Sequence, residues 1–131
     1  MDLMERRAHL KIQPNPDRKL DYLITLEGHL PSTTSTRQSV EVRYVPDKNI
    51  MDVKAFGAYL EALASIDWPS PEELAVTVIT DINNELIARW VQVTVNAPDL
   101  LHHAIETHGV VLEDRQPDWD NPMLLNRLER I

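Results

Sequence analysis

The sequence predicts an α+β fold in which an antiparallel sheet carries two helices packed on one of its faces. Two segments before residue 46 alternate apolar and polar residues, as half-buried strands do. Two segments between residues 52 and 86 instead repeat apolar residues at helical spacing, and another alternating segment follows at residues 89–95. Runs of strands separated by a helical layer are typical of α+β proteins with antiparallel sheets.

The length and composition fit one compact domain. The chain has 131 residues, of which 43% are hydrophobic and 26% are charged, near the average of globular proteins. Residues 1–19 show no sustained periodicity and contain Pro14 and Pro16, so we expect an N-terminal arm there. Residues 20–131 are expected to form a single domain.

Charge and cysteine content exclude several classes of function. The formal net charge of −8, without a cluster of lysines and arginines, argues against a nucleic-acid partner. The absence of cysteine excludes disulfides, thiolate metal sites and a cysteine nucleophile. No signal-peptide pattern follows Met1, and no apolar run is long enough to span a bilayer, so we expect a cytoplasmic protein without a membrane partner.

Two expected strands form the first part of the domain. Apolar residues occupy alternate positions from Leu20 to Leu26, with Leu23 as the exception. A polar connection at residues 31–36 separates this segment from a second alternating segment, Val40 to Tyr44. We expect the two strands to pair as an antiparallel hairpin.

Two helices are expected next. Residues 46–49 break the strand pattern, and a helix is expected from about Asp52, with an apolar face made by Val53, Phe56, Leu60, Leu63 and Ala64. Ser70 and Pro71 then combine an N-cap serine with a proline at the first helical position. The apolar stripe of this second helix continues to Leu86.

The remaining elements are shorter. Alternation predicts a strand that ends near Val95, and a short helix is expected from Pro98 to His108, with Gly109 as its C-terminal stop. Residues 110–112 predict a short strand, and residues 123–128 a final helical turn. The sequence does not determine where the segment 114–131 lies in the fold.

The residues from Tyr44 to Leu60 read YVPDKNIMDVKAFGAYL and resemble a known strand-to-helix signature. QueF-type 7-cyano-7-deazaguanine (preQ0) reductases, the nitrile reductases of queuosine biosynthesis, read Tyr-Ile-Pro-Asp and, a few residues later, Glu-Ser-Lys-Ser-x-Lys-x-Tyr-Leu. The order of elements is also similar to theirs over residues 20–95. The resemblance implies a tunnelling fold (T-fold), whose subunits form homo-oligomers with binding sites at subunit interfaces.

The resemblance also implies a substrate pocket. The family's substrate contacts surround the motif glutamate, whose neighbourhood corresponds to Met51, Asp52 and Val53. A second family glutamate anchors the guanine-like edge of the heterocycle and corresponds to Glu72, with Glu73 one residue away as an alternative. Such a carboxylate accepts two parallel N–H bonds, and burying it disfavours rings that lack these donors.

The departures from the family concern catalysis. Between their first two strands the reductases carry Cys-Pro-x-Thr-Gly-Gln-Pro-Asp, whose thiolate attacks the nitrile, whereas this chain reads LPSTTSTR from Leu30. Leucine offers no nucleophile, so we do not expect nitrile reduction by this chain alone. NADPH is implied as a cofactor only through Lys54, which corresponds to the motif lysine, because Gly57 replaces the second motif lysine.

Three hypotheses for the function follow. In the first, the protein binds a 7-deazaguanine, purine or pterin-like heterocycle through Asp52 and Glu72. In the second, it is a non-catalytic structural or regulatory oligomer that retains the fold, and Asp52 and Glu72 serve only their helix starts. The third is an enzyme that uses acid and base groups on such a ring without a covalent step.

The histidines do not predict a metal site. His102 and His103 are adjacent, so on a helix they point about 100° apart, whereas two ligands on one helix face need a spacing of four. His108 also lacks a partner at the required spacing in the sequence. We therefore predict no metal.

Overall fold

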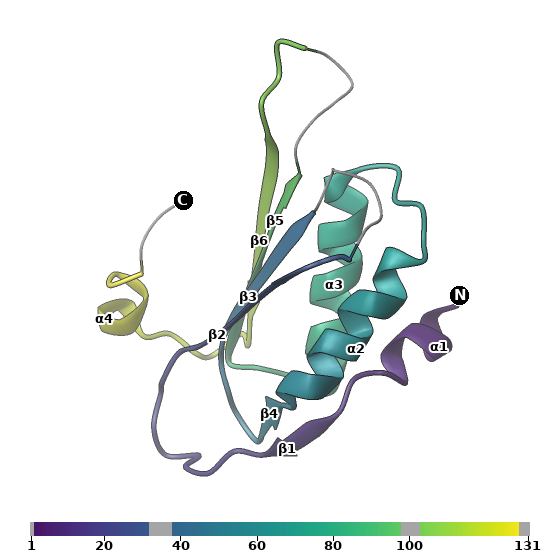
Figure 1. The fold of residues 1–131 in the computed structure, drawn as a ribbon. Coiled ribbons are helices and arrows are strands. Elements are labelled where there is room, and N and C mark those ends of the chain that lie inside the picture. Colours follow the sequence, from purple (N-terminus) through teal and green to yellow (C-terminus); the bar gives the residue numbers. More distant parts are fainter. Residues whose placement is uncertain (1, 32–37, 98–102, 129–131) are drawn as a thin grey trace.

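The structure is a computed structural model that describes residues 2–31, 38–97 and 103–128. A four-stranded antiparallel sheet has the order β2-β3-β5-β6, formed by Ile24–His29, Ser39–Val45, Trp90–Ala97 and His108–Arg115. Helices α2 (Val53–Ala64) and α3 (Pro71–Leu86) pack on one face of this sheet (Figure 1). The α+β class with an antiparallel sheet and two helices on one face is confirmed.

The main core lies between this sheet and the two helices. Strands β3 and β5 are central, and their alternate residues bury completely beneath α2 and α3. Helix α3 buries the apolar stripe that its spacing predicts, and α2 buries Phe56, Leu60 and Leu63 as predicted. Val53, predicted for the same face of α2, is instead exposed, because it lies at the first position of the helix, beyond the edge of the core. Its fully buried members include Val42, Tyr44, Val91, Val93, Tyr59, Leu63, Leu74, Val78 and Ile82. Among the described residues, no helix has both the length and the apolar character needed to cross a bilayer.

The N-terminal arm contains two elements that its sequence does not predict. Helix α1 spans Leu3–Arg7 and buries none of its residues. Strand β1 (Ile12–Pro14) pairs antiparallel with β4 (Asn49–Met51) in a second, two-stranded sheet. Both elements are too short to show a period. Leu10, which is buried in the main core, anchors the arm between them.

Two boundaries of the first strands differ from the sequence-based expectation. Strand β2 begins at Ile24 rather than Leu20, which is 56% exposed. The backbone oxygen of Leu20 accepts a hydrogen bond from Arg89 Nη1 at 3.1 Å, so a side chain takes the place of a neighbouring strand there. The expected break after Pro46 is shorter than predicted, because the chain pairs again from Asn49.

The predicted short helix at residues 98–108 is wrong where it can be compared. Residues 98–102 lie outside the described part of the chain, residues 103–104 form a turn, and β6 begins at His108. Gly109 lies within β6, opposite Asn96, and is not a helix stop. The predicted strand at 110–112 is therefore the middle of an eight-residue strand, because the ladder with β5 continues to the pair Ala97 and His108.

The C-terminal segment crosses the face of the sheet opposite α2 and α3. Helix α4 (Pro122–Leu125) lies on the side of the sheet opposite α2 and α3 (Figure 1). Leu125 is buried against Val45 and Trp90, and further apolar residues pack around them: Leu23, Trp119, Leu124 and Leu128. This smaller cluster gives a position to a segment that the sequence alone leaves unplaced.

Candidate functional site

Asp52 and Glu72, the two carboxylates predicted to bind the heterocycle, lie at opposite ends of the helical layer. Helices α2 and α3 run antiparallel, Asp52 caps the start of α2, and Glu72 lies in the first turn of α3 (Figure 1). Helix α2 has 12 residues, which corresponds to a length of about 18 Å. Within one chain, therefore, the fold does not bring Asp52 and Glu72 together.

Both oxygens of the Asp52 carboxylate have hydrogen-bond partners within the chain. Oδ2 accepts from the backbone N–H of Ala55 at 2.9 Å, which is the N-cap interaction of α2. Oδ1 accepts from Gln13 Nε2 at 2.7 Å and so ties the cap to β1. The carboxylate thus performs a local structural task, the alternative that its position before a helix already indicates.

The neighbours of Asp52 point in different directions. Met51 is buried, and its backbone N–H donates to the Tyr44 hydroxyl at 2.8 Å. Val53 is 65% exposed and Lys54 is exposed on the surface of α2. Neither of the two surface hollows described for the protein, one at the start of α3 and one between Arg7 and Asp114, is lined by Met51, Asp52, Val53 or Lys54.

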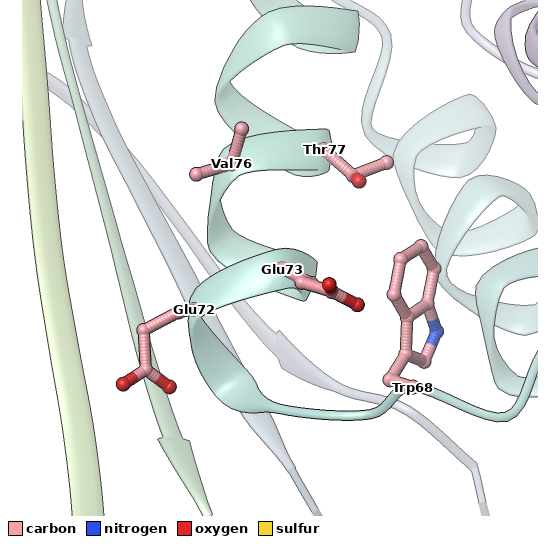
Figure 2. Close-up of a pocket in the computed structure, with 5 residues that line it drawn as sticks. All are labelled: Trp68, Glu72, Glu73, Val76 and Thr77. Atoms are coloured by element: carbon pink, nitrogen blue, oxygen red, sulfur yellow. The ribbon is translucent and has the colours of Figure 1, made fainter.

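A hollow of about 340 Å³ lies instead at the start of α3. Five residues line it: Trp68, Glu72, Glu73, Val76 and Thr77. Figure 2 shows that Glu73 and Thr77 point toward the indole of Trp68, whereas Glu72 and Val76 project from the other side of the helix, toward the strands. The hollow thus contains Glu72 and the alternative anchor Glu73, and it is Glu73 that faces the aromatic ring.

Local sequence explains this geometry. The Ser70 hydroxyl caps α3 by accepting from the backbone N–H of Glu73 at 3.2 Å, and Pro71 starts the helix. This places Glu72 and Glu73 in the first turn, about 100° apart around the axis. Trp68 Nε1 donates to the backbone oxygen of Leu63 at 2.9 Å, which orients the indole beside them.

The two glutamates differ in their partners. Glu72 Oε2 lies 3.0 Å from Nε2 of His108, at the start of β6. The Glu73 carboxylate is exposed and has no hydrogen-bond or ion-pair partner among the described residues. Both charges suit the positive end of the α3 dipole. Glu73 therefore offers a carboxylate with free acceptor sites next to an aromatic surface.

The segment that corresponds to the reductases' catalytic loop is only partly described. Leu30, at the position of their cysteine, is 6% exposed and belongs to the main core. Residues 32–37 lie outside the described part. In the described part of the chain, no group of three or more histidine, aspartate or glutamate side chains has the arrangement to hold a metal ion.

Sequence reasoning missed two features. The first is Trp68, whose position just before the Ser70 cap is a signal that it flanks the glutamates. The second is Asp81, which stands beside Ile82 on the apolar side of α3, where an aspartate needs a partner.

No protein-family model matches the chain, and no curated protein matches it significantly. The likeness to the nitrile reductases therefore depends on the residues quoted above, chiefly Tyr44 to Leu60.

Proposed function

We propose that the protein binds a flat, nitrogen-rich heterocycle of the 7-deazaguanine, purine or pterin type in the hollow at the start of α3. The observation that carries the proposal is the Glu73 carboxylate, which faces the Trp68 indole and has no hydrogen-bond or ion-pair partner among the described residues (Figure 2). Binding without nitrile reduction is proposed, because the chain contains no cysteine and Leu30 is buried in the core.

The chemistry of the hollow matches such a ring. An aminopyrimidinone edge presents two parallel N–H donors, which one carboxylate accepts in a bidentate, charge-assisted pair. The indole offers a flat apolar surface on which the ring can stack. Glu73 takes the role of anchor in this proposal because Glu72 is already held by His108.

A second subunit would complete the site. The hollow is open on its outer side, so a ring bound in it would keep one face in water unless another chain covered it. Strands β2 and β6 are the unpaired edges of the four-stranded sheet, and unpaired edges favour association between copies. We therefore propose a homo-oligomer in which the hollow lies at a subunit interface.

Calorimetric titration tests the proposal. The purified protein is titrated with 7-cyano-7-deazaguanine, guanine and pterin, and with hypoxanthine, which lacks the exocyclic amino group. We expect the first group to bind more tightly than hypoxanthine, by about tenfold or more, since a lost charge-assisted hydrogen bond costs about 1.5–3 kcal/mol. Glu73→Gln should remove this preference.

The matched control is Glu72→Gln, which changes the adjacent residue of the same helical turn. It should leave the preference for an amino-bearing ring intact. If none of these rings binds, or if Glu73→Gln binds all of them as the unchanged protein does, the assignment of the hollow is wrong.

The hydrogen bonds of Asp52 favour a second candidate, a non-catalytic oligomer that retains the fold. A carboxylate with both oxygens engaged by Ala55 and Gln13 has less capacity to hold a ligand. Light scattering after size-exclusion chromatography separates the candidates when combined with the titration. An oligomer that binds no ring would support the second candidate.

A further inference from the structure

The face of the sheet opposite α2 and α3 carries a row of four side chains that the proposed heterocycle site does not use. Strand alternation places Glu27, Glu41, Thr94 and Val111 on this face. The register makes them direct neighbours across β2, β3, β5 and β6, since Glu27 pairs with Glu41, Glu41 with Thr94, and Thr94 with Val111. The C-terminal segment packs elsewhere on this face, at Val45 and Trp90.

The acidic end of the row has an uncompensated charge. Glu27 and Glu41 are directly opposite each other, an arrangement of like charges that destabilises a sheet. Arg43 Nε lies 3.6 Å from Glu41 Oε1, and Arg43 also donates to Gln92. Glu27 is exposed and has no hydrogen-bond or ion-pair partner in the part of the chain that the structure describes. Two carboxylates and one guanidinium therefore leave a single negative charge.

The next member of the row is a buried hydroxyl without a partner. Thr94 is 3% exposed, and its Oγ1 makes no hydrogen bond with any described residue. A buried hydroxyl in this state carries a desolvation cost that a bound donor would relieve. On its other side Val111 is 47% exposed on an edge strand and presents apolar surface.

We propose that this row binds a primary alkylamine. The ammonium group lies over Glu41, the middle of the three polar residues, donates to the Glu27 and Glu41 carboxylates and to Thr94 Oγ1, and neutralises the remaining charge. The alkyl chain extends over Val111. Because the hydroxyl is buried in the free protein, binding requires the side chains around Thr94 to shift and uncover it.

Other occupants fit the row less well. A metal ion would need more ligands than two carboxylates and a hydroxyl supply, and no group of three metal-binding side chains occurs among the described residues. A second copy whose two-fold axis passed through this row would bring Glu27 and Glu41 against an identical acidic pair, which repels. The neighbouring Glu113 is already engaged, since it accepts from Trp90 Nε1 at 2.7 Å.

Titration of the full chain with n-butylamine, followed by the backbone amide NMR signals of β3 and β5, tests the inference. Saturable shifts are expected at residues flanking Glu41 and Thr94. n-Butanol shares the alkyl chain without the charge, and tetramethylammonium shares the charge without N–H donors, so neither should produce them. Glu27→Gln should weaken butylamine binding by about tenfold, and Thr94→Val by about threefold, in proportion to the charged and neutral hydrogen bonds lost.

Glu61→Gln is the matched control, because Glu61 is an exposed glutamate on α2, on the other side of the sheet. It should bind butylamine as the unchanged protein does. Absence of saturable binding, equal binding of tetramethylammonium, or an unaltered affinity in Glu27→Gln would each overturn the inference. The outcome is independent of the heterocycle titration, which reports on the hollow at α3.

Discussion

Arg6 Nε donates to Asp81 Oδ2 at 2.9 Å and joins the N-terminal arm to α3 across 75 positions of the sequence. Arg7 Nε donates to the other oxygen at 2.9 Å, and the Tyr59 hydroxyl donates to Oδ2 at 2.7 Å. Asp81 is fully buried, so these donors replace the water that its carboxylate loses. The hydrogen bond to Asp81 is the main cause that raises the pKa of Arg6.

The first prediction concerns this network. Changing Arg6→Gln and Arg7→Gln together leaves the buried Asp81 with Tyr59 as its remaining partner, which should lower the free energy of unfolding by about 3 kcal/mol. Each single change should cost about 1 kcal/mol, because the other arginine still compensates the charge. Urea denaturation measures all three variants.

Arg18→Gln is the control for these variants, since Arg18 is an exposed arginine of the same arm. Its backbone oxygen accepts from Arg89 Nη2 at 2.6 Å, a contact that the substitution keeps. It should change stability by no more than about 0.5 kcal/mol. Additive losses in the double variant would contradict the shared-carboxylate arrangement.

The second prediction concerns alkaline pH. Burial is the main cause that raises the pKa of Tyr59, and the nearby charge of Asp81 adds to it; burial also raises the pKa of Tyr44. In the unfolded chain these phenols ionise near the ordinary tyrosine pKa of 10.0, whereas the folded chain keeps them protonated above it. The contribution of the two tyrosines to the free energy of unfolding is therefore fully present below pH 10.0 and declines as the pH rises above this value.

The direction of this pH dependence is checked by urea midpoints measured between about pH 8 and pH 11, a range that includes the ordinary tyrosine pKa of about 10. Tyr59→Phe should be less stable at pH 8, because it loses the bond to Asp81. Its midpoint should also fall less steeply above pH 10 than that of the unchanged protein. If the urea midpoints of the variant and of the unchanged protein fell equally steeply with pH, Tyr59 would not be the group that resists ionisation.

The third prediction contrasts two glycines. A Cβ at Gly28 would lie 2.7 Å from Leu60 Cδ1, so Gly28→Ala should push α2 or its leucine away from β2 and cost about 1–3 kcal/mol. A Cβ at Gly57 would meet nothing within 4 Å, so Gly57→Ala should stabilise the exposed face of α2 by about 0.5–1 kcal/mol. Thermal unfolding compares them; a gain at Gly28 would mean that Leu60 has room to move.

The fourth prediction separates the structural and ligand roles of Asp52. Asp52→Ala removes the cap on α2 and the bond to Gln13 and should cost about 1–2 kcal/mol. Gln13→Ala should cost less, and it should have little further effect in the Asp52→Ala background. If Asp52→Ala instead keeps its stability and loses ring binding, the carboxylate belongs to the ligand site.

The fifth prediction concerns the unpartnered hydroxyl of Thr94. Thr94→Val keeps the shape of the side chain and removes a buried group without a hydrogen bond, so it should raise the free energy of unfolding by about 1 kcal/mol. Thr80→Val is the comparison, because the Thr80 hydroxyl donates to Val76 O at 2.7 Å. A loss of stability in Thr94→Val would reveal a partner for its hydroxyl.

The fold was predictable where one element repeats its pattern over several turns or pleats. Strand β3, strand β5 and both long helices show their period clearly, and the start of α3 follows from Ser70 and Pro71 alone. Strands β1 and β4 have three residues each, too few to show alternation, and they pair across 35 positions or more of the chain. Gly109 resembles a helix stop in the sequence because the ladder that includes it depends on β5.

Some features of the candidate site could likewise be predicted from the sequence, and others could not. Glu72 and Glu73 were predicted beside a helix start, a local property that any capped helix of this sequence would have. Only the tertiary structure decided that Trp68 faces Glu73, that Asp52 lies at the other end of the helical layer, and that Asp81 is paired with Arg6 and Arg7. Periodicity and helix capping depend on residues that are close together in the sequence, so they can be recognised from the sequence alone. Which distant side chains share a cavity or a charge depends on how the elements pack, and that packing is a property of the whole molecule.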